Sequence, residues 1–351
     1  MAAITPCLTR STNSSGDLQV RVGVPVLDDY LRFVEARTRP NTVLATAYDL
    51  VVFFRLVGKP PAEVTVADVL DFITAQRTGP GDRRLRVVTD GTGLSARTVR
   101  RRLSSVSGLF AYLLARGDVT VNPVPRGLPT RRERQRPRQG VPLIRTPRTL
   151  PQILAPAQVD ALLAALRTHR DRAMVQAMVL GGLRRCEVLG LRCEDLRVGE
   201  RRVFITEGKG GHQRLIPVSS RFFDSVAAYL DAERPAGATT GKVFVVLKGP
   251  RRGSPLTAAG LDEVLAGARR RAGLSRGTCH QLRHTCLTRL REAGMALEAV
   301  QAQAGHASIE STRIYLHLAD DWLAGQYRRA AEAIDAQVLA DHPLPTTGGA
   351  R

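Results

Sequence analysis

Residues 201–218 read RRVFITEGKGGHQRLIPV, and in this stretch apolar and polar residues alternate on either side of a glycine-rich turn. Such alternation is typical of β-strands, because successive side chains of a strand point to opposite faces. The stretch therefore predicts two short antiparallel strands joined by a tight turn. A further candidate strand is KVFVVL at 242–247. Helical periodicity surrounds both, so we expect a mainly α fold with a small antiparallel β-sheet (α+β).

Helical periodicity also organises the front of the chain. From Val26 onward, apolar residues recur every three or four positions in four segments. The last of them, SARTVRRRLSSVSGLFAYLLARG, begins at a capping Ser95 and ends at Gly117. The following interval, 126–148, carries eight arginines, four prolines and one acid, a composition that stays extended and seldom packs.

These patterns predict two domains with three connecting or terminal segments. We expect a flexible N-terminal tail at 1–19, a helical domain at 20–125, an Arg- and Pro-rich linker at 126–152, a second domain at 153–340 and a flexible C-terminal tail at 341–351.

Charge gives the first indication of function. Lys and Arg number 52 against 32 acids, a formal net charge of +20. Such an excess repels itself in the compact state and is usually tolerated when the partner is a polyanion. Arginine enrichment through GC-rich coding is the alternative explanation, but the charge is clustered. Four arginines crowd the first turns of the helix that begins at Ser95, namely Arg97, Arg100, Arg101 and Arg102.

The first turns of a helix already carry the positive end of its dipole, so clustered cations there are unfavourable in isolation. A phosphate backbone lying against that end would offset the cost, which predicts DNA binding by these four arginines. An arginine-rich face in contact with solvent is the alternative.

The sequence argues against several other classes of protein. Its five cysteines form no CxxC pair, and the cluster around HQLRH, CHxxxHxC, matches no common zinc spacing. No run approaches the roughly 18 to 20 consecutive apolar residues of a membrane-spanning helix, and the first residues lack the apolar segment of a secretory signal. We therefore expect a soluble cytoplasmic protein that binds no membrane and no metal.

Two motifs place charged residues where chemistry could use them. GGLRRCEVLGLRCEDL puts Arg184 near the start of a helix, with Glu187 three residues later on the same face. EGKGGHQRLIPV puts Lys209 in the tight turn between the two predicted strands.

Two further motifs follow in the second domain. HQLRH, which begins at His280, sets that histidine and Arg283 three residues apart on one helix face. AGHASIESTRIY sets His306 nine residues ahead of Tyr315.

In this order and with these spacings, the four motifs resemble those of the tyrosine recombinase and phage integrase family. That family's pattern is an Arg in GLRxxE, a hairpin Lys in GKGxxxRxxP, HxLRH, and GH with a Tyr nine residues later. The resemblance covers roughly Val20 to Ala336. Each motif alone is unspecific, but the ordered set is specific. AGH in place of the more usual LGH, and Cys186 where the family often has Ser or Thr, are departures from the pattern. The matching positions are Arg184, Lys209, His280, Arg283, His306 and Tyr315.

The resemblance implies a helical core-binding domain and a catalytic domain that together grip double-stranded DNA at specific recombination sites. It implies strand cleavage and rejoining through a 3′-phosphotyrosyl intermediate, with no metal or other cofactor. The family usually acts as a tetramer, so we expect a homo-tetramer or a hetero-assembly on DNA. The setting would be DNA integration, transposition or resolution in a bacterium.

The expected chemistry agrees with the residue types. Two guanidiniums, Arg184 and Arg283, can each bind non-bridging phosphate oxygens and stay charged at any working pH. The phenol of Tyr315 can attack phosphorus and hold the strand covalently. The remaining roles that the resemblance implies are proton acceptor or relay for His280, proton donor to the departing 5′ oxygen for Lys209, a phosphate hydrogen bond for His306 and a brace for Glu187.

Ordinary structural roles remain open for each residue taken singly. Arg184 could simply pair with Glu187, Lys209 could be an unremarkable hairpin lysine, and Tyr315 could pack in a core. Tyr327 lies on an apolar helical stripe, so we reject it as the nucleophile. Two other functions also remain: a type IB topoisomerase that acts as a monomer, and a DNA-binding protein without catalysis.

Overall fold

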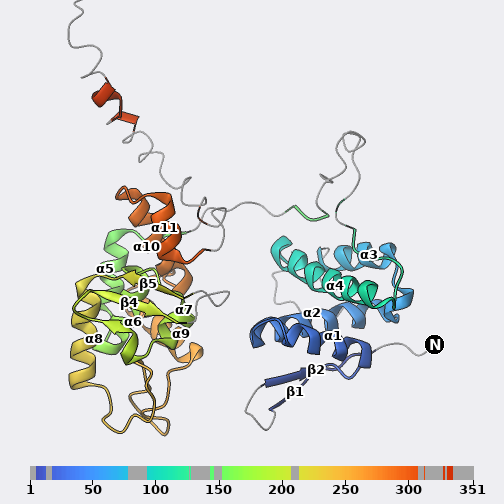
Figure 1. Cartoon of the computed structure of the whole chain (residues 1–351), viewed down its shortest axis with the longest axis horizontal. Coiled ribbons are helices and arrows are strands. Elements are labelled where there is room, and N and C mark those ends of the chain that lie inside the picture. Colours follow the sequence, from blue (N-terminus) through green and yellow to red (C-terminus); the bar gives the residue numbers. More distant parts are fainter. Residues whose placement is uncertain are drawn as a thin grey trace, which may run out of the picture. The chain divides into compact units, whose positions relative to one another are not determined.

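The computed structural model describes residues 5–12, 18–77, 93–125, 127, 143–145, 152–206, 213–306, 312, 327–328 and 330–334. The chain divides into two compact units, Met1–Arg148 and Thr149–Arg351 (Figure 1). Both are mainly helical, and the described strands form one two-stranded and one three-stranded antiparallel sheet. The predicted fold class is confirmed.

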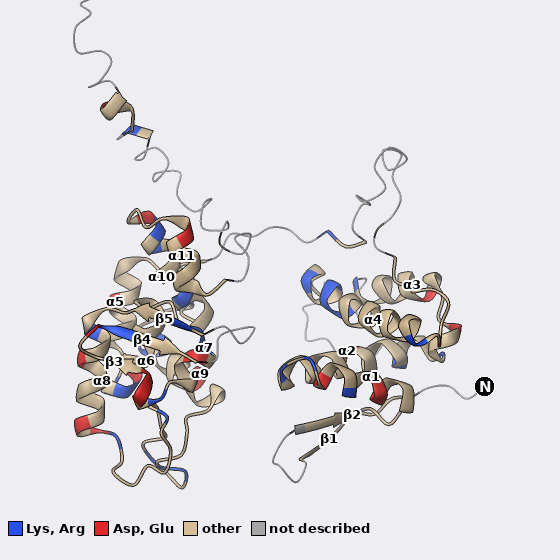
Figure 2. Ribbon diagram, viewed as in Figure 1, with Lys and Arg blue, Asp and Glu red and all other residues tan. Residues whose placement is uncertain are grey.

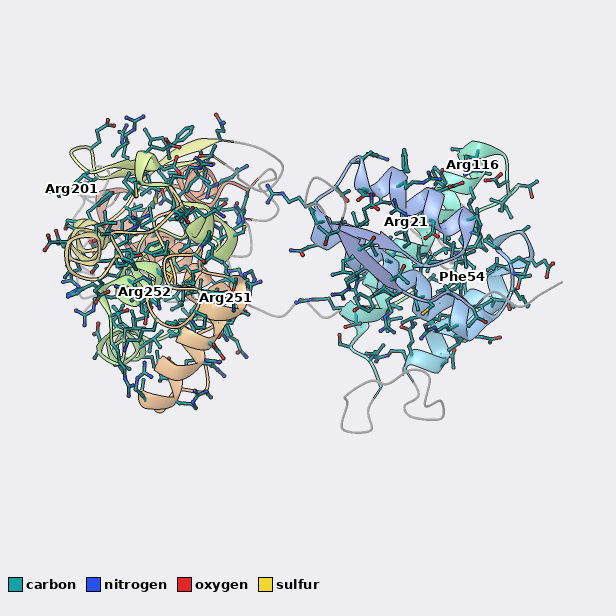
Figure 3. All side chains as sticks on the ribbon, turned by 90° about the horizontal axis from the view of Figure 1, so that it is seen from below. Arg21, Phe54, Arg116, Arg201, Arg251 and Arg252 are labelled. Carbon is teal, nitrogen blue, oxygen red and sulfur yellow. The ribbon has the colours of Figure 1, made fainter. Side chains whose placement is uncertain are left out.

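The first unit packs four helices around an apolar core. Its elements are β1 (Thr9–Thr12), β2 (Leu18–Arg21), α1 (Pro25–Glu35), α2 (Pro40–Val57), a 3-10 turn (Pro61–Glu63), α3 (Val66–Arg77) and α4 (Ala96–Arg116). Ser95 caps α4 as expected, since its hydroxyl accepts a hydrogen bond from the backbone N–H of Thr98 at 3.2 Å. Figure 3 shows the side chains that fill this unit, with Phe54 of α2 fully buried among them.

The expectation of a flexible tail at residues 1–19 is wrong for the described part of that segment. β1 pairs with β2 in an antiparallel hairpin, and the backbone N–H of Cys7 donates to the carbonyl of Val22 at 2.9 Å. Val20 and Val22 are each 1% exposed and belong to the core. β1, TRST, is polar and exposed throughout, and the alternation of β2, LQVR, is only four residues long, too short to be distinguished from a loop.

Helix α2 is long and apolar enough to cross a membrane by length and composition alone. It nevertheless carries Asp49 and Arg55, and eight of its residues are buried inside the first unit. Its apolarity is therefore explained by its place in the core.

The second unit contains a small sheet and a larger set of helices. Its elements are α5 (Pro156–Ala164), α6 (His169–Val179), α7 (Arg185–Gly190), a 3-10 turn (Cys193–Asp195), β3 (Leu196–Arg197), β4 (Arg202–Ile205), β5 (Arg214–Pro217), α8 (Ser220–Ala232), α9 (Ala258–Arg271), α10 (Cys279–Glu292) and α11 (Leu297–Ala304). The sheet order is β3-β4-β5, and β4 and β5 are the two strands predicted on either side of the glycine-rich turn.

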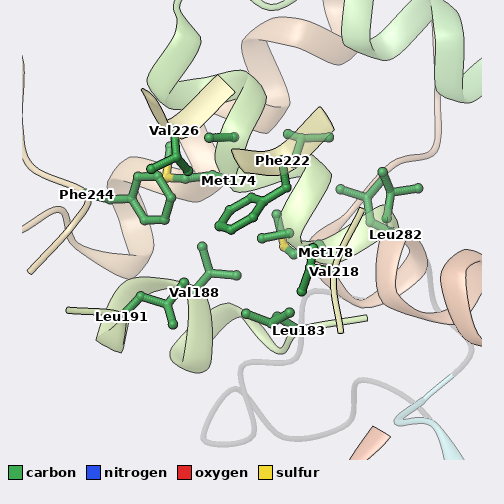
Figure 4. Packing of buried hydrophobic residues seen from close by; sticks show 14 of the residues in the cluster. Met174, Met178, Leu183, Val188, Leu191, Val218, Phe222, Val226, Phe244 and Leu282 are labelled. Atoms are coloured by element: carbon green, nitrogen blue, oxygen red, sulfur yellow. The ribbon is translucent and has the colours of Figure 1, made fainter. Parts of the chain in front are cut away.

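Helix α6 is the centre of this unit. Nine of its eleven residues are buried, and it contacts α7, α8 and α10. Figure 4 shows Met174 and Met178 of α6 packed among side chains from α7, α8 and α10. A helix enclosed on all sides is rigid, so the elements that pack on it have fixed positions relative to one another.

KVFVVL does not form the predicted strand. Val243, Phe244 and Val245 are buried, but this segment makes only isolated bridges, from Lys242 to Arg192 and from Val245 to Pro255. Its apolar run reflects burial in the core without a continuous strand partner, which periodicity alone cannot distinguish from a strand. The third strand is instead β3.

The hairpin of the first unit leads to a prediction about its stability. Val20 and Gln19 are adjacent on β2, and only Val20 is fully buried. We expect Val20→Ala to lower the free energy of unfolding by about 2 kcal/mol, because it leaves a cavity in the core. Gln19→Ala is the matched control and should change it by less than about 0.5 kcal/mol. Equal, small effects in urea unfolding would mean that this segment is a tail after all.

Candidate active site

The loop between α6 and α7 positions Arg184 and Glu187. The chain leaves α6 and turns sharply at Gly182, whose φ is +70°, so that α7 begins directly after Arg184. A Cβ at Gly181 would lie 2.8 Å from the carbonyl oxygen of Ala177, which leaves no room for a side chain. Glu187 then caps its own helix, since it accepts a hydrogen bond from the backbone N–H of Arg184 at 2.8 Å.

Glu187 is a fully buried carboxylate surrounded by arginines. Its Oε1 accepts from Arg184 Nη1 at 2.7 Å and from Arg214 Nη1 at 3.0 Å. Its Oε2 accepts from Arg214 Nη2 at 2.9 Å and lies 4.0 Å from Arg283 Nη1. Burial alone would raise the pKa of Glu187, but the bonds from Arg214 and Arg184 outweigh it and hold that pKa below its ordinary value.

Helix α10 supplies Arg283, which is 4% exposed. Its guanidinium donates to the carbonyl of Gly182 and, at 2.6 Å, to that of Ala304. Its Nη2 also lies 3.2 Å from Nε2 of His306. Arg283 therefore joins the turn before α7 to the C-terminal end of α11.

The end of α11 brings His306 into the same cluster. Gly305 ends the helix with a φ of +59°, and its carbonyl accepts from Arg184 Nη2 at 3.0 Å. The buried side chain of Gln303 donates to the carbonyls of Gly181 and Pro217, which fixes α11 against the loop and β5. His306 Nδ1 lies 2.9 Å from the hydroxyl of Thr312.

His280 lies on α10 one turn before Arg283 and pairs with a second histidine. The Nε2 atoms of His280 and His284 are 2.8 Å apart, and the two rings meet edge to face. Burial, reinforced by Arg283 and by the positive charge that His280 and His306 carry when protonated, lowers the pKa of His284 to about 4. His284 is therefore neutral near pH 7. The hydrogen bond between the two rings then needs a proton on only one of the two facing Nε2 atoms.

The structure thus brings together four of the residues singled out by sequence: Arg184, Glu187, Arg283 and His306. His280 is on the same helix as Arg283. Lys209 and Tyr315 lie outside the described residues. In the described chain, no group of three or more His, Cys, Asp or Glu side chains is arranged to hold a metal ion.

Comparisons with known proteins agree with this constellation. Residues 152–321 match the phage integrase family. The chain is 32% identical over 280 residues to the tyrosine recombinase XerD of Mycobacterium tuberculosis, which covers 77% of this chain and 84% of that protein. It is also 32% identical over 299 residues to the tyrosine recombinase XerC of Roseiflexus castenholzii, covering 81% and 85%.

The chain belongs to the tyrosine recombinase family. Members of the family are DNA strand-cleaving and rejoining enzymes, so the predicted enzyme class is confirmed. The fold agrees as well: a structure of the Tn1549 transposon integrase in complex with transposon right end DNA superimposes with a TM-score of 0.64 at 19% identity, covering 87% of this chain and 99% of that one.

Two residues of this recombinase's cluster, Arg214 and Gln303, were not predicted from the sequence. Arg214 stands at the Arg position of the GKGxxxRxxP motif, so the motif contained the signal, but nothing in it showed that the side chain turns towards Glu187. Gln303 carries no motif, and its role follows only from the position of α11.

The four arginines at the start of α4 in the first unit differ in their surroundings. Arg97 and Arg100 are exposed. Arg101 donates to the buried Asp49 at 2.6 Å, and Arg102 donates to Gln76 at 2.7 Å with its side chain 15% exposed. The side chain of Arg102 therefore belongs to the packing of the unit. Figure 2 shows the arginines of α4 in blue.

The lowered pKa of His284 leads to a prediction about pH. In the folded state His284 stays neutral down to about pH 4, whereas in the unfolded chain it gains a proton near pH 6.5. The unfolded state therefore binds more protons between these values, and stability is lost as pH falls from about 6.5 towards 4. We expect the free energy of unfolding to fall less steeply over this range in His284→Gln than in the wild type.

The control is His169→Gln, since His169 is exposed at the start of α6. It should keep the wild-type slope in urea titrations at each pH. A His284→Gln slope equal to that of the wild type would contradict the assignment.

Proposed function

We propose that this recombinase cleaves and rejoins DNA at specific sites through a 3′-phosphotyrosyl link to Tyr315. The observation that carries the proposal is the convergence of Arg184 and Arg283 on the buried Glu187, with His306 in contact with Arg283. Three guanidiniums, including Arg214, face one carboxylate, which leaves a surplus of two positive charges in a partly enclosed site.

This surplus of positive charge is complementary to the negative charge of the phosphate in the reaction. A phosphodiester carries one negative charge, and attack by a phenolate brings a second onto the pentacoordinate phosphate. Preorganised cations stabilise that charge without having to reorganise as it develops. A guanidinium has five N–H donors, and Arg184 bonds two described protein oxygens, so donors remain for phosphate oxygens.

The proposed step forms one bond and breaks another at phosphorus. The oxygen of Tyr315 attacks, its proton passes to His280, and the 5′ oxygen leaves as a hydroxyl after it takes a proton from Lys209. The bond energy is kept in the phosphotyrosyl link, and attack by a 5′ hydroxyl on that link rejoins the strand. His280 is suited to accept a proton because its neighbour His284 is neutral at neutral pH.

We infer that DNA is the polyanion that the net charge of +20 attracts, that the protein acts on it in the bacterial cytoplasm, and that it assembles there as a tetramer. Tyr327 and Ile334 are 72% and 59% exposed, which supports docking of the terminal segment on another protomer. A measured stoichiometry of four protomers on two sites would separate this assembly from a monomeric type IB topoisomerase. Integration, transposition and resolution are the settings in which this chemistry would serve.

The assignment of the nucleophile predicts the outcome of a trapping experiment. On a nicked suicide substrate, wild-type protein should form a covalent DNA adduct that is visible by denaturing electrophoresis. Tyr315→Phe removes only the attacking oxygen, so the variant should bind DNA and form no adduct. Tyr327→Phe is the matched control and should form as much adduct as the wild type. An adduct in Tyr315→Phe would contradict the proposal, and a wild-type protein that binds DNA without any adduct would favour a binding protein without catalysis.

The two kinds of arginine on α4 predict different effects on binding. Arg97 and Arg100 are exposed, so we propose that they bind phosphates. Replacing both with alanine should reduce the slope of log affinity against log salt concentration by about 0.9 for each phosphate that the variant no longer neutralises. Arg102→Ala should instead lower the thermal stability of the helical unit, since Arg102 is bonded to Gln76 inside it. An unchanged salt slope in the double variant would mean that these arginines face only solvent.

A further inference from the structure

Arg214 makes contacts on two sides that no role in the reaction explains. It is the first residue of β5, and both of its terminal nitrogens donate to Glu187, at 3.0 and 2.9 Å. Its side chain is 13% exposed. A Cβ built on Gly305 would lie 2.8 Å from Cζ of Arg214, so the backbone of Gly305 lies directly against the guanidinium.

These two contacts coincide with the two points that hold Arg184. Arg184 donates from Nη1 to Glu187 and from Nη2 to the carbonyl of Gly305. Glu187 therefore binds both Arg184 and Arg214. Gly305 contacts Arg214 through its backbone and accepts a hydrogen bond from Arg184. A displacement of Arg214 would move both supports of Arg184 together.

Arg214 itself is poorly placed to bind phosphate. The edge of its guanidinium that carries Nη1 and Nη2 is occupied by Glu187, and Gly305 lies against the group. Its Nε is buried without a hydrogen-bond partner among the described residues. Unlike Arg184, whose two bonds go to different partners, Arg214 directs its two-pronged edge to a single carboxylate, and its Nε edge is buried. This arrangement favours a role towards the protein over a two-pronged contact with phosphate.

We propose that Arg214 is a positioning residue for the chemical step, which holds Arg184 in place through Glu187 and Gly305. The inference rests on the proposed function of Arg184. An arginine is needed here because a planar fork can bind both carboxylate oxygens and still offer a flat surface to Gly305, whereas a lysine ammonium bonds at one point. Glycine is favoured at residue 305, because the backbone there has a positive φ and because a Cβ would displace the guanidinium of Arg214.

The test is the single-turnover rate of adduct formation on a suicide substrate at saturating DNA. We expect Arg214→Lys and Arg214→Ala to lower the rate constant by about 100-fold, the effect of an active-site group misplaced by about 1 Å. DNA affinity should stay within about twofold of the wild type, because Arg214 does not touch DNA. Arg214→Lys keeps the charge, so its defect would isolate the loss of the two-point contact.

A double-mutant cycle with Arg184→Ala shows whether the effect passes through Arg184. In the Arg184→Ala background, Arg214→Lys should lower the rate constant by less than about twofold, because the guanidinium that Arg214 positions is already absent. A 5′-bridging sulfur in the substrate should not restore the rate of Arg214→Lys. Rescue by sulfur would mean that Arg214 acts through Lys209, and additive losses would mean that it acts independently of Arg184; either result would overturn the inference.

Arg170→Ala is the matched control for a purely structural effect. Arg170 is also buried in the second unit, and it bonds Asp171 at 2.7 and 2.9 Å and the carbonyl of Val245 at 2.9 Å, away from the arginine cluster. It should lower the melting temperature yet keep the wild-type cleavage rate well below that temperature. If Arg170→Ala and Arg214→Lys lost cleavage equally, Arg214 would only stabilise the fold, and the inference would be wrong. Absence of any adduct in the wild type would instead refute the proposed function itself.

Discussion

The buried carboxylate of Glu187 is the interaction on which the second unit's site depends. A fully buried carboxylate is stable only when hydrogen-bonded cations compensate it. Here Arg184 precedes α7 and Arg214 begins β5, while Arg283 on α10 lies at the edge of ion-pair distance. Without Glu187 these like charges would repel one another, so one acid allows the fold to gather the positive charge that a phosphate transition state requires.

The first unit also contains a buried carboxylate that binds arginine, and there it fixes the packing of two helices. Asp49 is 1% exposed in the core helix α2, and it accepts bonds from Arg101 and Ser105 of α4. Burial raises the pKa of Asp49 even though Ser105, Arg101 and Arg102 act in the opposite direction. The acid fixes the rotation of α4 about its own axis. Arg97 and Arg100 are then left at the surface, while Arg102 is drawn into the packing.

Sequence predicted the parts of this structure that depend on local spacing. A three-residue interval on a helix places Arg184 near Glu187, and alternation around a glycine-rich turn predicts β4 and β5. It could not predict contacts decided by tertiary packing. The direction of Arg214 and the burial of Arg102 each depend on residues far apart in the chain. The hairpin of β1 and β2 pairs nearby residues, and it escaped prediction because its strands are too short to show a clear pattern. The same limit applies to KVFVVL, whose burial resembles that of a strand.

The most direct test of Tyr315 as the nucleophile is to locate the covalent bond to DNA by mass spectrometry of the trapped adduct. Trypsin cleaves after Arg313 and Arg328, so Tyr315 and Tyr327 fall in one peptide, and fragmentation must separate them. We predict that the nucleotide mass remains on the fragments that contain Tyr315 and is absent from those that contain only Tyr327. A nucleotide on Tyr327, or on any residue other than Tyr315, would contradict the proposed mechanism.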